Sequence, residues 1–171
     1  MNVRLIVKRL CSIVFAFLFL LSAAATLQAE LPTKKVLTLG LARRLVAAAE
    51  AEAKKRGATV VIAVVDDGGQ LILLERLDDT QVASVEVAIG KARTAAIFRR
   101  PSRDFEDQVR NGRVAALALP GATPLQGGIP VTVEGKVIGA IGASGNSPQE
   151  DEGIALAGAA VTAAAVQEEG R

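Results

Sequence analysis

The chain has 171 residues, no histidine, tryptophan or tyrosine, and a formal net charge of +2. Its single cysteine and single methionine are Cys11 and Met1. The absence of histidine excludes serine–histidine and cysteine–histidine catalysis, and with only one cysteine it also excludes zinc sites of the cysteine/histidine kind. Beyond residue 29 the chain carries 17 basic and 18 acidic residues. A charge so balanced argues against nucleic acid as a partner.

Residues 1–29 have the pattern of a secretory signal peptide. Three basic residues among the first nine precede a short apolar stretch, Ile13–Leu21, and small residues follow as far as Ala29. An uncleaved anchor is the alternative, because the uncharged span is just long enough to cross a bilayer. The short apolar stretch and the small residues favour cleavage. We therefore expect a mature protein of residues 30–171 that is periplasmic or secreted and not held in a membrane.

The first part of the mature chain predicts two helices around a β-hairpin, and then a third helix. Thr38 is placed to cap the first helix and Gly57 to end it. Asp66–Gly69 is turn chemistry between two strands, and Pro101 ends the second helix. The elements expected here are helix 39–56, strand 60–65, strand 70–76, helix 81–98 and a short helix capped by Ser102 that ends near Asn111-Gly112.

The second part predicts three strands and a final helix. Glu134-Gly135 forms a tight turn, and Ser147-Pro148-Gln149-Glu150 is a capping box with proline at the first helical position. Small residues on every face of the last helix favour burial between the sheet and a partner subunit, hence a homo-oligomer. The elements expected here are strands 114–119, 129–133 and 136–143 and helix 147–167.

These elements predict an α+β fold in one domain, residues 30–171. Tight hairpins imply antiparallel pairing, so we expect a five-stranded antiparallel sheet with packed helices, in the order α-β-β-α-α-β-β-β-α. The glycine-rich run Gly139–Gly145 fits no phosphate-binding or nucleophile-elbow pattern. The acidic runs Asp66-Asp67, Asp78-Asp79 and Glu150–Glu152 have simpler explanations as turns and helix starts, and no metal site is predicted.

Polar groups on the second helix suggest an anionic pocket. Ser84, Lys91 and Thr94 lie on that helix, with Ser84 and Lys91 two turns apart on one face, and Arg76 ends the preceding strand. Together they could line a small pocket for an anion. The alternative is a lysine whose stem lies on apolar surface while its ammonium reaches solvent. The residues alone leave both readings open.

Four stretches of the chain are similar to the GlcG/HbpS-like family, also called the haem-degrading family. The resemblance covers about residues 37–165. Each stretch is ordinary alone, and the combination is specific. The stretches are LTLGLARRLVAAAEAEAKKRG, VVIAVVDDGGQLILLERLDD, SVEVAIGKARTAAIFRRPS and LQGGIPVTVEGKVIGAIGASGNSPQEDEGIALAGAA.

The resemblance implies a domain like profilin in outline, assembled into homo-oligomers, in a family whose members bind haem or other tetrapyrroles or serve glycolate and cobalamin pathways. This chain departs from the family in having Asp78-Asp79-Thr80 where Asp-Gly-Ala is common. It also lacks histidine, so imidazole-ligated haem has no counterpart here. Family residues that we take as a candidate ligand pocket are Arg76, Asp78, Ser84, Lys91, Thr94, Gly127, Gly128 and Ser144.

Three functions follow as hypotheses. The first is an exported, non-catalytic homo-oligomer that binds haem, another tetrapyrrole or a small anionic metabolite. The second is an enzyme acting on a small oxygenated acid with Lys91 or Asp78 as acid or base. The third is a structural oligomer that binds a protein partner. No catalytic residue is assigned, and the mature chain offers haem iron no His, Met, Cys or Tyr ligand.

Overall fold

The computed structural model describes residue 31 and residues 33–169, with side chains as far as Ala163. The expected signal peptide lies outside the described residues. The chain divides into residues 1–34 and a folded unit of residues 35–171, and the fold below is that of the second unit. None of the helices in the described part is long and apolar enough to cross a membrane.

The centre of the folded unit is an antiparallel sheet of four strands in the order β2-β1-β4-β3. Strand β1 is buried from Val61 to Val65, as its wholly apolar sequence predicts for a strand covered on both faces. The strands are β1 (Val61–Asp66), β2 (Leu71–Arg76), β3 (Gly128–Val133) and β4 (Lys136–Ser144).

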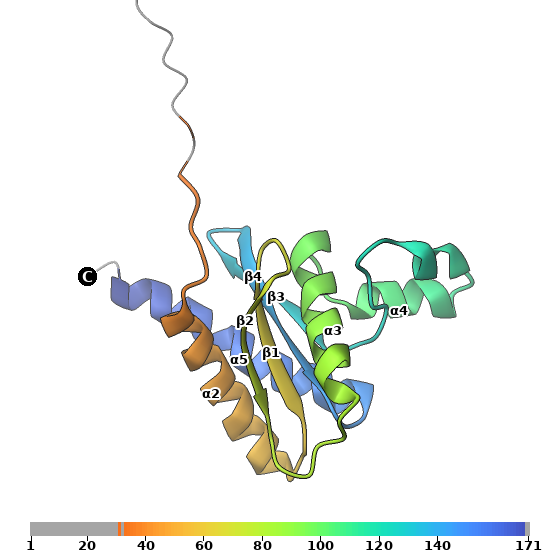
Figure 1. Ribbon diagram of the computed structural model, residues 1–171. Coiled ribbons are helices and arrows are strands. Elements are labelled where there is room, and N and C mark those ends of the chain that lie inside the picture. The colour runs from red at the N-terminus through yellow and green to blue at the C-terminus, as the bar shows by residue number, and fades with distance from the viewer. Residues whose placement is uncertain (1–30, 32, 170–171) are drawn as a thin grey trace, which may run out of the picture. The chain divides into compact units, whose positions relative to one another are not determined.

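Helices cover both faces of this sheet (Figure 1). Helices α2 (Leu39–Arg56) and α5 (Pro148–Glu169) pack on one face, where Leu45, Ile62, Ile141 and Ile154 belong to the main apolar core. Helix α3 (Ser84–Phe98) covers the other face through small alanines. Helix α4 (Arg103–Arg110) lies to the side of the sheet beyond α3 (Figure 1).

Several local predictions are confirmed. Thr38 Oγ1 accepts a hydrogen bond from Leu41 N at the start of α2, and Gly57 ends that helix with φ 64°. The Ser147 and Glu150 side chains exchange hydrogen bonds with each other's backbone amides at the start of α5. These helices therefore begin and end where short-range hydrogen-bond chemistry places them.

The fifth strand, predicted over 114–119, is wrong. Val114–Ala118 forms a short 3-10 helix, η1, between Gly112 and Pro120. Val114 and Leu117 are exposed, and only Ala116 of the segment is buried. A short apolar run without a partner strand gains no ladder hydrogen bonds, and its composition alone does not separate strand from helix. The observed order is therefore α-β-β-α-α-η-β-β-α.

One capping contact and one boundary also differ from the prediction. Helix α4 begins directly after Ser102, as predicted, but the Ser102 side chain does not cap it. Its hydroxyl instead bonds the loop before β3. Helix α3 begins at Ser84 rather than near Gln81, after a turn at residues 82–83. At Ser102 these longer-range contacts outweigh the local capping signal.

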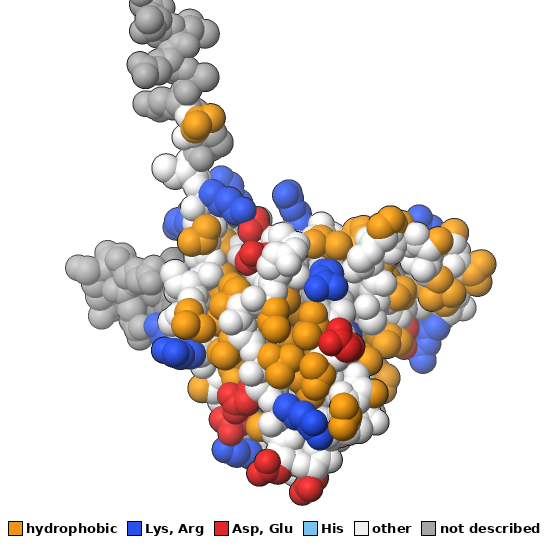
Figure 2. Space-filling model, in the orientation of Figure 1, with side chains coloured by type: hydrophobic (Ala, Val, Ile, Leu, Met, Phe, Trp, Pro, Cys, Tyr) orange, Lys and Arg blue, Asp and Glu red, His pale blue; other side chains and the backbone are white. Residues whose placement is uncertain are grey.

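Strand β2 is one edge of the sheet and is only half covered. Leu71 is exposed, and Ile72, Leu73 and Leu74 are partly buried. Figure 2 shows hydrophobic side chains exposed on this face of the molecule, where β2 runs between α2 and α3.

Candidate functional site

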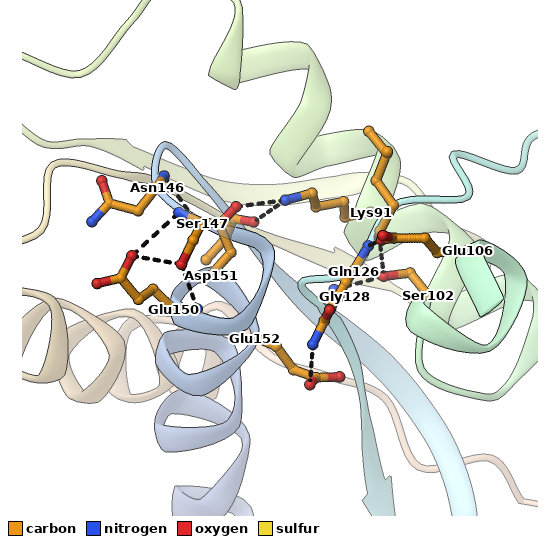
Figure 3. Close-up of polar contacts among 12 residues, drawn as sticks. Lys91, Ser102, Glu106, Gln126, Gly128, Asn146, Ser147, Glu150, Asp151 and Glu152 are labelled. Atoms are coloured by element: carbon orange, nitrogen blue, oxygen red, sulfur yellow. Dashed lines mark hydrogen bonds and ion pairs between the residues drawn. The ribbon is translucent and has the colours of Figure 1, made fainter. Parts of the chain in front are cut away.

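A buried ion pair joins the middle of α3 to the first turn of α5 (Figure 3). Lys91 Nζ donates to Asp151 Oδ2 at 2.7 Å and to the Ala143 carbonyl at 3.1 Å. The side chains of Lys91 and Asp151 are only 5% and 3% exposed. The lysine therefore does not reach solvent, which removes the surface-lysine alternative, and its charge is already balanced inside the protein.

Asp151 is held from several sides. Its Oδ1 accepts the Asn146 amide at 3.0 Å, and its place in the first turn of α5 puts a carboxylate at the positive end of the helix dipole. Burial nevertheless raises the pKa of Asp151 above its usual range, and the bonds from Lys91 and from the Asn146 and Gly145 amides offset only part of that effect. The pair therefore holds a desolvated carboxylate whose charge depends on the lysine.

Gly127 and Gly128 complete the surroundings of this pair. A Cβ at Gly127 would lie 3.0 Å from Lys91 Nζ and 3.1 Å from Asp151 Cβ, and its φ of 127° suits glycine. At Gly128 a Cβ would meet the Lys91 backbone. Side chains at these positions would push α3 and α5 away from β3, so the two glycines let the ion pair form.

A second polar network lies next to the pair and fixes the loop before β3 (Figure 3). Ser102 Oγ donates to the Leu125 carbonyl at 2.6 Å and accepts from Gly128 N at 2.8 Å. Gln126 donates from its amide to Glu106 and from its side chain to Glu152, at 2.6 and 2.7 Å. Sequence reasoning missed this network, because its members come from separate segments and each alone resembles a surface residue or a cap.

Thr94 belongs to the same loop-fixing arrangement. Its hydroxyl donates to the Gly90 carbonyl at 2.7 Å and accepts from Thr123 N at 2.7 Å. Both contacts are to backbone, so the hydroxyl already donates and accepts within the protein. The structure therefore gives Lys91, Thr94, Gly127 and Gly128 packing and hydrogen-bonding roles around the loop of residues 123–128.

The other predicted pocket residues lie at one end of the sheet. Val61 pairs with both Arg76 and Ser144, so these three side chains share a face of the sheet. Val61 packs with Ala88 of α3, and Ser84 lies one turn before Ala88. Asp78 is exposed in the turn after β2. The candidate residues thus form two groups, around Lys91 and around Ser84, that lie two turns apart on α3. The two groups meet at the end of β4, where Ser144 follows the Ala143 carbonyl that accepts from Lys91.

A family model described as "Haem degrading protein HbpS-like" matches residues 37–160. Protein GlcG of Escherichia coli K12 is 45% identical over 112 residues, which is 66% of this chain and 84% of that protein. An uncharacterised 15.0 kDa protein of Citrobacter freundii is 37% identical over 123 residues, 70% of this chain and 87% of that one.

This chain matches solved structures of the same fold over nearly the whole length of those structures. Klebsiella pneumoniae protein ORFY has a TM-score of 0.75 and 27% identity, covering 81% of this chain and 99% of that one. HbpS has a TM-score of 0.72 and 35% identity, covering 81% and 98%. A PduOC:heme complex has a TM-score of 0.67 and 27% identity, covering 74% and 94%.

The residues of this chain do not fit a haem iron ligated in the usual way. Protein ligands to haem iron are His, Cys, Met or Tyr, and this chain has neither histidine nor tyrosine. Its one cysteine and one methionine, Cys11 and Met1, precede the described residues. Lys91 is committed to Asp151. No group of three or more acidic, cysteine or histidine residues that could hold a metal ion occurs in the described part of the chain.

Proposed function

Because the chain belongs to the HbpS-like family, we propose that it is a non-catalytic binding protein for a small molecule that carries carboxylates. The ligand is haem or another tetrapyrrole, or a small anionic metabolite; both present carboxylate groups. The observation that carries this proposal is the likeness of the chain to a heme-bound PduOC over 94% of that structure. Because the chain has no histidine or tyrosine to bind a haem iron, the proposal includes that the protein recognises the periphery of the ligand rather than its metal.

A comparison of hemin with metal-free protoporphyrin IX tests the proposal. If the protein contributes no axial ligand, the two should bind with Kd values within about threefold of each other, a difference below 1 kcal/mol. The chain has no tryptophan or tyrosine, so its own absorbance and emission barely interfere with those of the porphyrin. The proposed function would be refuted if the protein bound neither hemin nor protoporphyrin IX and also bound no small carboxylate such as malonate.

We further propose that the protein is exported and acts as a homo-oligomer. The pattern of residues 1–29 supports export, and N-terminal sequencing of the secreted material checks it by beginning near Glu30. An outward stripe on α5 supports self-association. Leu156, Ala160 and Ala163 are exposed at helical spacing, and such a small, apolar surface suits close packing against a second copy.

A further inference from the structure

A row of side chains crosses one end of the sheet beneath the first turn of α3. Val61 lies at the centre of the row, with Arg76 opposite it on β2 and Ser144 opposite it on β4. Val61 and Ala88 belong to one apolar cluster, so the row faces α3. Since α3 runs parallel to β1, as its packing first on Val61 and then on Val65 shows, the N-terminal end of α3 lies over this row.

Ser84 occupies that end of the helix and is the anomaly of the region. It is 1% exposed, and its Oγ is one of two buried side-chain polar atoms in the described part of the chain without a hydrogen-bond partner. Ser84 is four residues before Ala88 and so lies on the same face of α3, the face that packs on the sheet. A buried hydroxyl without a partner is destabilising. A bound acceptor would satisfy it.

Arg76 brings a positive charge to the same place and is held there. Its Nε and Nη2 donate to the Thr80 carbonyl at 3.1 and 2.7 Å, which ties the end of β2 to the turn that leads into α3. No described residue accepts from its Nη1. The Nη1/Nη2 edge of the guanidinium is therefore open, and this edge can bind a carboxylate with two parallel hydrogen bonds.

The start of α3 adds a favourable field. Its N-cap residue, Ala83, provides no side-chain cap, so no side-chain oxygen of that residue already occupies the positive end of the helix. Glu86 in the first turn of α3 and Asp78 and Asp79 on the preceding turn are exposed, so solvent and salt weaken their repulsion of an anion. Ser147 and Glu150 cap α5, so α5 does not offer the equivalent place.

We infer that Arg76, Ser84 and Ser144 form a carboxylate-binding cradle at the N-terminal end of α3. The guanidinium of Arg76 pairs with the carboxylate, and the Ser84 hydroxyl donates to one of its oxygens. This inference rests on the proposed function and names the group of the ligand that is recognised. That group is a propionate if the ligand is a tetrapyrrole and the carboxylate itself if the ligand is a small acid.

The test compares protoporphyrin IX with its dimethyl ester, which has the same ring without the two charges. Both are titrated into the wild type and into R76Q and S84A, with R93Q as the matched control. Arg93, like Arg76, donates to a backbone carbonyl, that of Gly69, but it lies on α3 toward the end of the helix away from Ser84. We expect R76Q and S84A each to weaken binding of the free acid about tenfold and to leave binding of the ester unchanged. R93Q should bind both porphyrins as the wild type does.

Equal binding of the acid and the ester by the wild type, or wild-type affinity for the acid in both R76Q and S84A, would overturn the cradle while leaving the proposed function standing. If no porphyrin binds, malonate titrated into ¹⁵N-labelled protein decides the question. Amide shifts centred on Thr80 and Ser84 support the cradle, and their absence refutes it. The melting temperature of S84A gives a further readout. It should equal or exceed that of the wild type, because the variant loses a hydroxyl that has no partner.

Discussion

Lys91 and Arg76 show at the scale of single residues how a cation can serve the fold or remain open to a ligand. Lys91 is buried, and its ammonium is balanced by Asp151. Arg76 is exposed, uses one edge of its guanidinium on the backbone of the Thr80 turn, and leaves another edge open. The compact ammonium suits a buried point contact, whereas the planar guanidinium can bind two partners at once.

Replacing Lys91 by methionine tests the ion pair. The change leaves the Asp151 carboxylate buried without its partner, and we expect a loss of about 3 kcal/mol in the free energy of unfolding near neutral pH. Burial already raises the pKa of Asp151, and loss of the ammonium raises it further. Above the ordinary carboxyl pKa of about 4 the folded variant then binds more protons than the unfolded chain, so its stability falls as pH rises.

Urea unfolding of K91M and of the double variant K91M/D151N between about pH 5 and pH 8 measures this effect. The double variant buries no charge at this position, so it should recover part of the lost stability and lose the pH dependence that is specific to K91M. A stability loss in K91M that is the same across this range would contradict the account of Asp151.

At the scale of elements, the outward stripe of α5 makes a prediction about assembly. If Leu156, Ala160 and Ala163 face a second copy, A160E buries a charge without a partner and should lower the oligomeric state. Ala51 is an exposed alanine on α2, so A51E is the matched control and should leave the assembly unchanged. Size-exclusion chromatography with light scattering reads both variants. An A160E variant with the mass of the native oligomer would remove α5 from the interface.

Sequence predicted the elements whose signals are local. Thr38, Gly57 and the Ser147–Glu150 box are capping signals within one turn of the chain, and the structure confirms them. The segment 114–119 was predicted wrongly as a strand, because a strand depends on a partner elsewhere in the chain, which local composition does not report. Ser102 was assigned to a cap for a related reason: its actual partners, Leu125 and Gly128, lie more than 20 residues away.

The candidate site was predictable only as a set of residue types. The helical spacing of Ser84 and Lys91 places them on one face of α3, but it gives no indication that Lys91 meets Asp151 across 60 residues. That ion pair follows from the pairing of β4 with β1, which brings the end of β4 and the start of α5 beside α3. Likewise the row of Arg76, Val61 and Ser144 depends on the register of three strands, and register is fixed by tertiary packing.

At the scale of the whole molecule, the fold places the starts of α3 and α5 and the end of β4 near one end of the sheet (Figure 1). Arg76 ends β2 at the same end, opposite Val61. The near-neutral charge of the chain beyond residue 29 provides no long-range attraction for anions. Recognition of a carboxylate must therefore come from groups held close together, and affinity should depend on a few side chains.

The absorption spectrum of hemin bound to the purified protein tests this account most directly. Since the described residues offer iron no conventional ligand, we predict weak hemin binding with a broad, high-spin-like band near 400 nm. We expect R76Q to weaken this binding further. A tight, stoichiometric complex with a sharp six-coordinate spectrum, unchanged in both R76Q and K91M, would contradict the claim that the protein recognises the carboxylates of its ligand rather than its metal.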